Sequence, residues 1–170
     1  YNIDIPYEPT YVSRAPHFIN RDPVVVIDGY AYVTLSDDFG SAAGNVLIIY
    51  DISNFNRPVE VKRMNFNRPR GLGVDETEKK LFICDDTIVK VYDITDPETP
   101  VRIGDSRAVT GWRFDAYDVI VQTDKQHLLV IGPDGLSQFH YGQGDDLVQL
   151  GSIPVETQPT KPCKIRTDLL

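Results

Sequence analysis

Cysteine, methionine and tryptophan are scarce in this sequence of 170 residues, which contains two, one and one of them. The two cysteines, Cys84 and Cys163, match no metal-binding or redox spacing, and a single pair is too few for a disulfide framework. Cys84 lies in the apolar run LFIC, which predicts a buried structural thiol. The alternative that the sequence leaves open is a disulfide between the two cysteines.

Long apolar runs are also missing, because the longest, 24–27 and 46–50, are far shorter than the ~18 residues that a membrane helix needs. We therefore expect no transmembrane segment. Basic residues are outnumbered, with 17 lysines and arginines against 25 acidic residues and a net charge of −8. An acidic chain is repelled by a nucleic-acid backbone and by an anionic membrane surface, so neither is expected as a partner.

Recognisable catalytic motifs are absent as well. The chain has no G-x-S-x-G nucleophile elbow and neither of the phosphate-binding patterns GxGxxG and GxxxxGK[ST]. Its three histidines, His17, His127 and His140, have no metal-ligand spacing. We therefore predict no catalytic residue, no cofactor and no metal.

What the sequence does contain is a threefold repeat of short, strand-sized apolar runs separated by turn signals. The first copy includes DPVVVIDG, YAYVTLS, NVLIIYDIS and VEVKRMNF. Asp28 and Asp75 close the first run of two copies, and Gln122 follows at the same step of 47 (75 − 28 = 122 − 75 = 47). This period predicts an all-β fold of antiparallel sheets: a β-propeller segment of about three four-stranded blades with partial flanking strands.

The repeat also predicts the organisation of the chain. Residues 1–21 are expected to be an extended arm or the remnant of a preceding blade, and residues 156–170 a proline-containing tail. Three copies are too few for a ring of the usual four to eight blades, so we expect the native chain to be longer at its amino end or the missing blades to come from another chain. The blades themselves are expected at 22–155, divided into 22–69, 70–115 and 116–155.

Two acidic segments that leave strands in successive copies, DISN at 51–54 and DITDP at 93–97, are predicted to be turns. Aspartate, serine, threonine and asparagine side chains hydrogen-bond nearby backbone N–H groups, and a proline close behind fixes φ for the entry into the next strand. We interpret these acids as structural.

The connectors between copies, 65–70 and 108–115, supply the candidate site. In a propeller such connectors end at the rim of the central channel, where their side chains share one cavity. An aromatic platform with arginines and carboxylates is typical of small-ligand or peptide recognition. The alternative is that Trp112 packs between blades and the charges pair with one another. The predicted ligand- or partner-binding residues are Arg21, Asp22, Arg68, Arg70, Trp112, Arg113, Asp115 and Asp118.

In this order and spacing, the runs resemble the LVIVD-repeat β-propeller family over about residues 20–155. Arg21 and Arg70 stand where the family pattern often has cysteine and histidine, so no site built on those residue types carries over. The residues that carry the resemblance are 22–26 (DPVVV), 28–34 (DGYAYVT), 51–54, 70–75 (RGLGVD), 81–85 (LFICD), 89–93, 116–120 and 129–136.

The resemblance implies a non-catalytic binding or scaffolding module of an extracytoplasmic protein, at the outer membrane or cell surface or in the periplasm. The family type is frequent in surface or periplasmic lipoproteins of Bacteroidetes-like bacteria, which implies a lipid anchor upstream of Tyr1. The expected partner is a protein or ligand of a cell-surface assembly. The alternative is a metal-assisted propeller hydrolase or lyase, motivated by acids at strand ends, especially Asp22, Asp85 and Asp118.

Overall fold

The computed structural model describes residues 11–12, 23–36, 44–106, 116–133, 135–142 and 146–154. These residues form three antiparallel four-stranded sheets and one short 3₁₀ helix, η1 (Thr123–Lys125). The predicted all-β class and the four-stranded antiparallel repeats are confirmed. The expected arm, apart from residues 11–12, and the expected tail lie outside the described residues.

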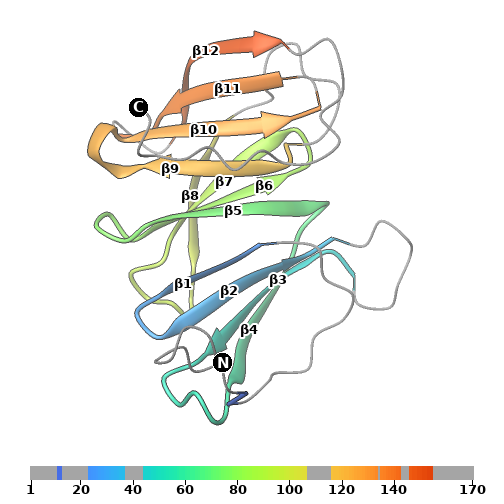
Figure 1. Cartoon of the computed structure of the whole chain (residues 1–170), viewed down its shortest axis with the longest axis vertical. Helices are drawn as coiled ribbons and strands as arrows, with labels where there is room; N and C mark the ends of the chain where they lie inside the picture. Colours follow the sequence, from blue (N-terminus) through green and yellow to red (C-terminus); the bar gives the residue numbers. More distant parts are fainter. Residues whose placement is uncertain are drawn as a thin grey trace.

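The strands of each sheet follow the order of the sequence, and the sheets lie one above another in an open stack (Figure 1). The first sheet contains β1 (Val24–Ile27), β2 (Tyr30–Leu35), β3 (Val46–Asp51) and β4 (Val59–Asn65). The second contains β5 (Pro69–Asp75), β6 (Lys80–Asp85), β7 (Ile88–Asp93) and β8 (Val101–Asp105). The third contains β9 (Asp118–Gln122), β10 (His127–Gly132), β11 (Gly135–His140) and β12 (Val148–Pro154).

The repeat is visible in the backbone at the turn between the first and second strands of each sheet. The last residue of this turn has a positive φ, of 80°, 52° and 53° in Gly29, Lys79 and Gln126. Its carbonyl accepts a hydrogen bond, at 2.8, 2.8 and 3.0 Å, from the backbone N–H groups of Ile52, Ile94 and Tyr141 respectively. The same hydrogen bond therefore ties the end of the third strand to this turn in every sheet.

The step of 47 residues is not uniform in the structure. Asp75 and Gln122 are the buried last residues of β5 and β9, whereas Asp28 lies one position beyond β1 in a two-residue turn with Gly29. Their φ values of 50° and 80° suit a type I′ turn, for which Asp-Gly is a preferred sequence. Because this hairpin is shorter, Ile27, rather than Asp28, is the register equivalent of Asp75.

A β-bulge recurs at one position in all three sheets. The pairing of the third and fourth strands shifts between Ile49 and Tyr50, Val91 and Tyr92, and Gln138 and Phe139. The fourth strand therefore contributes one extra residue, which is Val61, Ile103 or Leu150. A bulge increases the local twist of a strand pair, so each outer strand turns in the same way.

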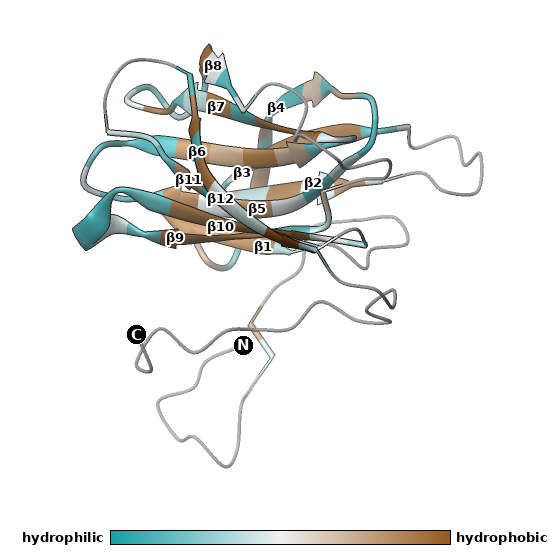
Figure 2. Ribbon diagram, turned by 90° about the horizontal axis from the view of Figure 1, so that it is seen from above, coloured by the Kyte–Doolittle hydropathy of each residue, from teal (hydrophilic) through white to brown (hydrophobic). Residues whose placement is uncertain are grey.

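Two hydrophobic clusters hold the sheets together. Side chains alternate between the two faces of a strand, so the second sheet packs one face on the first sheet and the other face on the third. The brown segments of Figure 2 accordingly lie within the strands. The first cluster joins Tyr32, Leu47 and Ile49 to Leu81, Ile83 and Tyr92, and the second joins Phe82, Val89 and Val91 to Leu128, Val130 and Phe139. A third, on the far face of the first sheet, contains Ala31, Val33, Leu35, Val46, Ile48 and Tyr50.

Cys84 belongs to the second cluster and is fully buried. Among the described residues it is a free thiol, as predicted for a structural cysteine, and Cys163 lies outside them. Burial raises the pKa of this thiol well above its usual range, and the nearby carboxylates of Asp118 and Asp85 raise it further. A thiol that stays protonated is a poor nucleophile, so Cys84 contributes packing and not chemistry.

Candidate functional site

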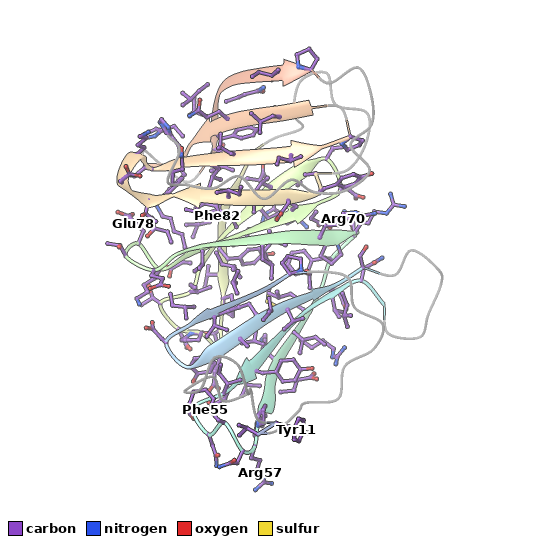
Figure 3. The ribbon with its side chains drawn as sticks, in the orientation of Figure 1. Tyr11, Phe55, Arg57, Arg70, Glu78 and Phe82 are labelled. Atoms are coloured by element: carbon purple, nitrogen blue, oxygen red, sulfur yellow. The ribbon has the colours of Figure 1, made fainter. Side chains whose placement is uncertain are left out.

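Three of the eight predicted site residues, Arg68, Arg70 and Asp118, belong to the described part of the chain. They lie where β5 and β9 begin. Figure 3 places Arg70 and Glu78 at opposite ends of β5. This edge is therefore far from the turns between the first and second strands of each sheet. The other five, Arg21, Asp22, Trp112, Arg113 and Asp115, lie outside the described residues.

Arg70 is the residue at which all three sheets meet. Its guanidinium carbon lies 5.1 Å from the centroid of the Tyr117 ring, just before β9. Its backbone carbonyl accepts a hydrogen bond of 2.6 Å from the hydroxyl of Thr34, in β2. A guanidinium over an aromatic face is stabilised by the ring quadrupole, by roughly 0.5–1 kcal/mol at an exposed site. The first, second and third sheets thus each contribute one group to this point.

Asp118 is brought next to β5 because Gly71 has no side chain. A Cβ atom built on Gly71 would lie 2.4 Å from the Cα atom of Asp118 and 2.8 Å from its Oδ1 atom. Asp118 Oδ1 accepts a hydrogen bond of 2.9 Å from the backbone N–H of Val119. The structure therefore places Arg70 and Asp118 on the same edge, because Arg70 directly precedes the glycine that contacts Asp118. Arg68 lies in the exposed turn before β5.

The Asp85 side chain fixes the turn before β5 through hydrogen bonds. Its carboxylate is fully buried, and Oδ1 accepts hydrogen bonds from the backbone N–H groups of Asn67, at 3.0 Å, and Arg68, at 2.6 Å. The Lys90 ammonium contacts Oδ2 as an ion pair without the geometry of a hydrogen bond, and it lies 4.9 Å from the centroid of the Phe66 ring. A buried carboxylate is costly unless it is paired, and here one cation and two N–H groups stabilise it. Asp85 thus positions the connector that leads to Arg70.

The acidic turn segments have the structural role predicted for them. Asp51 Oδ1 accepts the N–H of Ser53 at 2.8 Å, and Asp93 Oδ1 accepts the N–H of Thr95 at 2.7 Å. The side chains of Ser53 and Thr95, together with these N–H groups, hold the pKa of each aspartate below its usual value. Both carboxylates are used to close the turns between the third and fourth strands.

Metal-binding geometry is not present in the described residues, where no three histidine, cysteine, aspartate or glutamate side chains form a group that could hold an ion. His127 and His140 are cross-strand partners whose rings meet edge to face at 5.7 Å. The Gln138 amide nitrogen lies 3.0 Å from His127 Nδ1, at the far end of the third sheet from Arg70. His17 lies outside the described residues.

Tyr117, Thr34 and Lys90 complete this edge and were not among the predicted site residues. A signal for Tyr117 was present, because it follows Arg70 at the repeat step of 47 (117 − 70 = 47). The two residues that stack are therefore equivalent positions of successive copies. Thr34 and Lys90 lie inside strands, and no local pattern marks them as neighbours of the site.

Comparison with known proteins adds no family: no protein-family model and no curated protein sequence matches the chain. Within the described ranges, the protein has no helix that is both long and apolar enough to span a membrane. The fold and the edge around Arg70 define its class as an all-β protein of three repeated, stacked antiparallel sheets.

Proposed function

We propose that the chain is a segment of a β-propeller and that its role is non-catalytic binding or scaffolding. The propeller is supported by sheets that follow one another in the sequence, each in the strand order of a blade. The first strands of the second and third sheets, β5 and β9, approach each other directly, which Gly71 and Gly73 allow. The residue pattern on the outer faces of the first and third sheets supports it further.

These end faces are equivalent to the faces already used inside the stack. Ala31 and Val33 of the first sheet occupy the register of Leu81 and Ile83, which face the preceding sheet. Leu129 and Ile131 of the third sheet occupy the register of Phe82 and Cys84, which face the next sheet. By their register, these positions are the ones that would pack on a further sheet at either end. We therefore propose further blades, from the same or another chain, as partners of these faces.

The binding role rests on one observation: the Arg70 guanidinium stacks on Tyr117 at an edge to which three sheets contribute. The connector beside it is held by the buried Asp85, so the edge is fixed before any ligand arrives. A rigid aromatic group with a guanidinium suits a peptide or a small ligand with planar or anionic groups. Location at a bacterial surface or in the periplasm, with a lipid anchor, is proposed from the family resemblance.

The metal-assisted hydrolase or lyase is the weaker candidate. Of its three proposed acids, Asp85 already uses Oδ1 for two N–H groups and Oδ2 for Lys90. A metal would have to break these contacts in a buried position. Asp118 is engaged with the N–H of Val119, and Asp22 lies outside the described residues.

An array of synthetic peptides, probed with the labelled chain, tests the binding role. We expect a subset of peptides to lose at least about tenfold in affinity, roughly 1.4 kcal/mol, with Arg70→Ala and with Tyr117→Ala. Arg57→Ala is the matched control, because Arg57 is an exposed arginine at the lower end of the molecule, away from Arg70 (Figure 3). Absence of any bound peptide, or equal losses with Arg57→Ala, would reject this binding edge.

A further inference from the structure

The outer strand of the third sheet, β12, has an open and apolar edge. It pairs with β11 on one side, and no other described strand pairs with it. Val148, Leu150 and Ile153 are 53%, 51% and 64% exposed. A Cβ atom built on Gly151 would meet nothing within 4 Å. An unpaired edge of this kind presents backbone N–H and C=O groups to a further strand.

The other two outer strands are protected by charge. The edge of β4 carries Lys62 and an ion pair of 2.8 Å between Glu60 and Arg63. The edge of β8 carries an ion pair between Arg102 and Asp105. Charged side chains on an edge strand oppose pairing with another chain. The sequence of β12, VQLGSIP, contains no charged residue.

Along β12, the order of apolar and polar side chains on the two faces is the same when the strand is read from either end. Val148 and Ile153 pair with His140 and Leu136, so they share one face, whereas Gln149 and Ser152 share the other. The bulge makes this symmetry possible. Its extra residue, Leu150, corresponds to Val61 and Ile103, which both pack toward the next sheet, so Leu150 lies on the face of Val148.

We propose that β12 pairs antiparallel with β12 of a second copy of this chain, about a twofold axis between Leu150 and Gly151. Val148 of each copy then lies opposite Ile153 of the other, and Gln149 lies opposite Ser152. Apolar side chains meet apolar ones and polar meet polar, each on its own face. This self-complementarity selects a second copy as the occupant, because one strand supplies both halves of the match. The third sheets of the two copies form one continuous antiparallel sheet.

Sedimentation equilibrium of the whole chain, in a Cys163→Ser background, measures this association. We expect a reversible dimer that Val148→Lys weakens at least about tenfold, because each dimer then carries two ammonium groups opposite Ile153. Val101→Lys is the matched control, since Val101 starts β8 as Val148 starts β12 and is 61% exposed. A monomeric parent chain, or equal effects of the two lysines, would overturn the proposal.

Cysteine pairs test the register. Val148 and Ile153 of one strand are five positions apart, about 16 Å, which is too far for an intrachain disulfide. Val148→Cys combined with Ile153→Cys is expected to yield a covalent dimer on mild oxidation, and each single variant should yield little. Equal cross-linking of a single variant, or none of the double variant, would contradict the twofold pairing.

Discussion

The two interfaces between sheets meet the same packing requirement in different ways. Between the second and third sheets the strands come close. Cβ atoms on Gly71 and Gly73 would collide with Asp118 and with the Val121 side chain. The contact also includes a buried hydrogen bond of 2.7 Å from the Tyr141 hydroxyl to Asp75 Oδ2. This interface is short-range and specific.

Between the first and second sheets, besides the partly buried hydrogen bond from Thr34 to the Arg70 carbonyl, two polar links lie at the surface. Lys79 Nζ contacts Asp28 Oδ2 at 2.6 Å, and the Tyr30 hydroxyl donates to Glu98 Oε1 at 3.2 Å, both exposed. The buried Tyr32 hydroxyl has no hydrogen-bond partner among the described residues. The comparison shows that the repeat determines which positions face the neighbouring sheet, whereas a few individual residues determine how tightly the sheets dock.

The largest expected effect is that of Phe82→Ala, which removes a fully buried ring that packs 4.8 Å from the ring of Tyr141. We expect a loss of about 4 kcal/mol in the free energy of unfolding, measured by urea denaturation. Phe66→Ala is the counterpart at the other interface, where a half-buried ring lies 5.9 Å from Tyr92. It should cost about 2 kcal/mol, and an equal loss from both would remove the distinction between the interfaces.

Gly71→Ala tests the close approach of β5 and β9. An alanine in place of a strand glycine normally stabilises by about 0.4–1 kcal/mol, but this Cβ would press on the backbone of Asp118. We therefore expect the opposite sign, a loss of about 2 kcal/mol in the same denaturation experiment. Gly151→Ala, with open space around it, is the control and should change stability by less than about 0.5 kcal/mol. Stabilisation by Gly71→Ala would show that the strands lie farther apart.

Two tyrosine-to-phenylalanine variants should change stability in opposite directions. Tyr141→Phe removes a buried hydrogen bond to a carboxylate and should cost about 2 kcal/mol. Tyr32→Phe removes a buried hydroxyl that pairs with no described residue, and we expect no loss or a gain of up to about 1 kcal/mol. Thermal denaturation near neutral pH compares them directly. A clear loss for Tyr32→Phe would mean that its hydroxyl has a partner.

Alkaline pH should destabilise the protein through the buried Tyr32 side chain. Burial raises the pKa of Tyr32 to about 12, with smaller contributions from Tyr30, Asp28 and Asp96. An unfolded tyrosine ionises near pH 10, so the unfolded state loses its proton first and becomes favoured as the pH rises. The stabilisation is complete below pH ~10 and is lost between about 10 and 12. Urea denaturation across this window should show a shallower decline for Tyr32→Phe, and identical slopes would contradict the shift.

The smallest effect is expected for the exposed link between the first and second sheets. Asp28→Asn removes the charge that faces Lys79 while keeping a residue type that tolerates positive φ. The two side chains are 57% and 36% exposed, so the loss should stay below about 0.5 kcal/mol. Denaturation at low and high salt measures it, and a loss comparable with that of Tyr141→Phe would contradict the surface character of this link.

The sequence predicted the strands because their signals are local. Short apolar runs, the turn signals between them and the aspartates that open the DISN and DITDP segments each act over a few residues. The edge around Arg70 was predicted only in part. The charges of Arg70 and Asp118 mark them as candidates, whereas Tyr117 is marked only by the repeat step of 47 that links it to Arg70.

The role of Asp85 was beyond local reasoning. An acid at the end of a strand suggests a site, but the buried Asp85 is paired by Lys90 of β7 and by two backbone N–H groups of the connector before β5. The close approach of β5 and β9 could not be predicted from the sequence either, because Gly71 and Gly73 also fit the simple start of a strand. Only the packing of the second sheet on the third shows that they are needed for close contact.

The stacking of successive sheets through their inner strands is the claim on which the proposed propeller and its binding edge both depend. Nuclear Overhauser effects between the α-protons of Gly71 and Asp118 measure it most directly. We predict a clear cross-peak, because a Cβ atom on Gly71 would lie 2.4 Å from the Cα atom of Asp118. Its absence, in spectra that show the expected contacts between β5 and β6, would contradict the stacked arrangement.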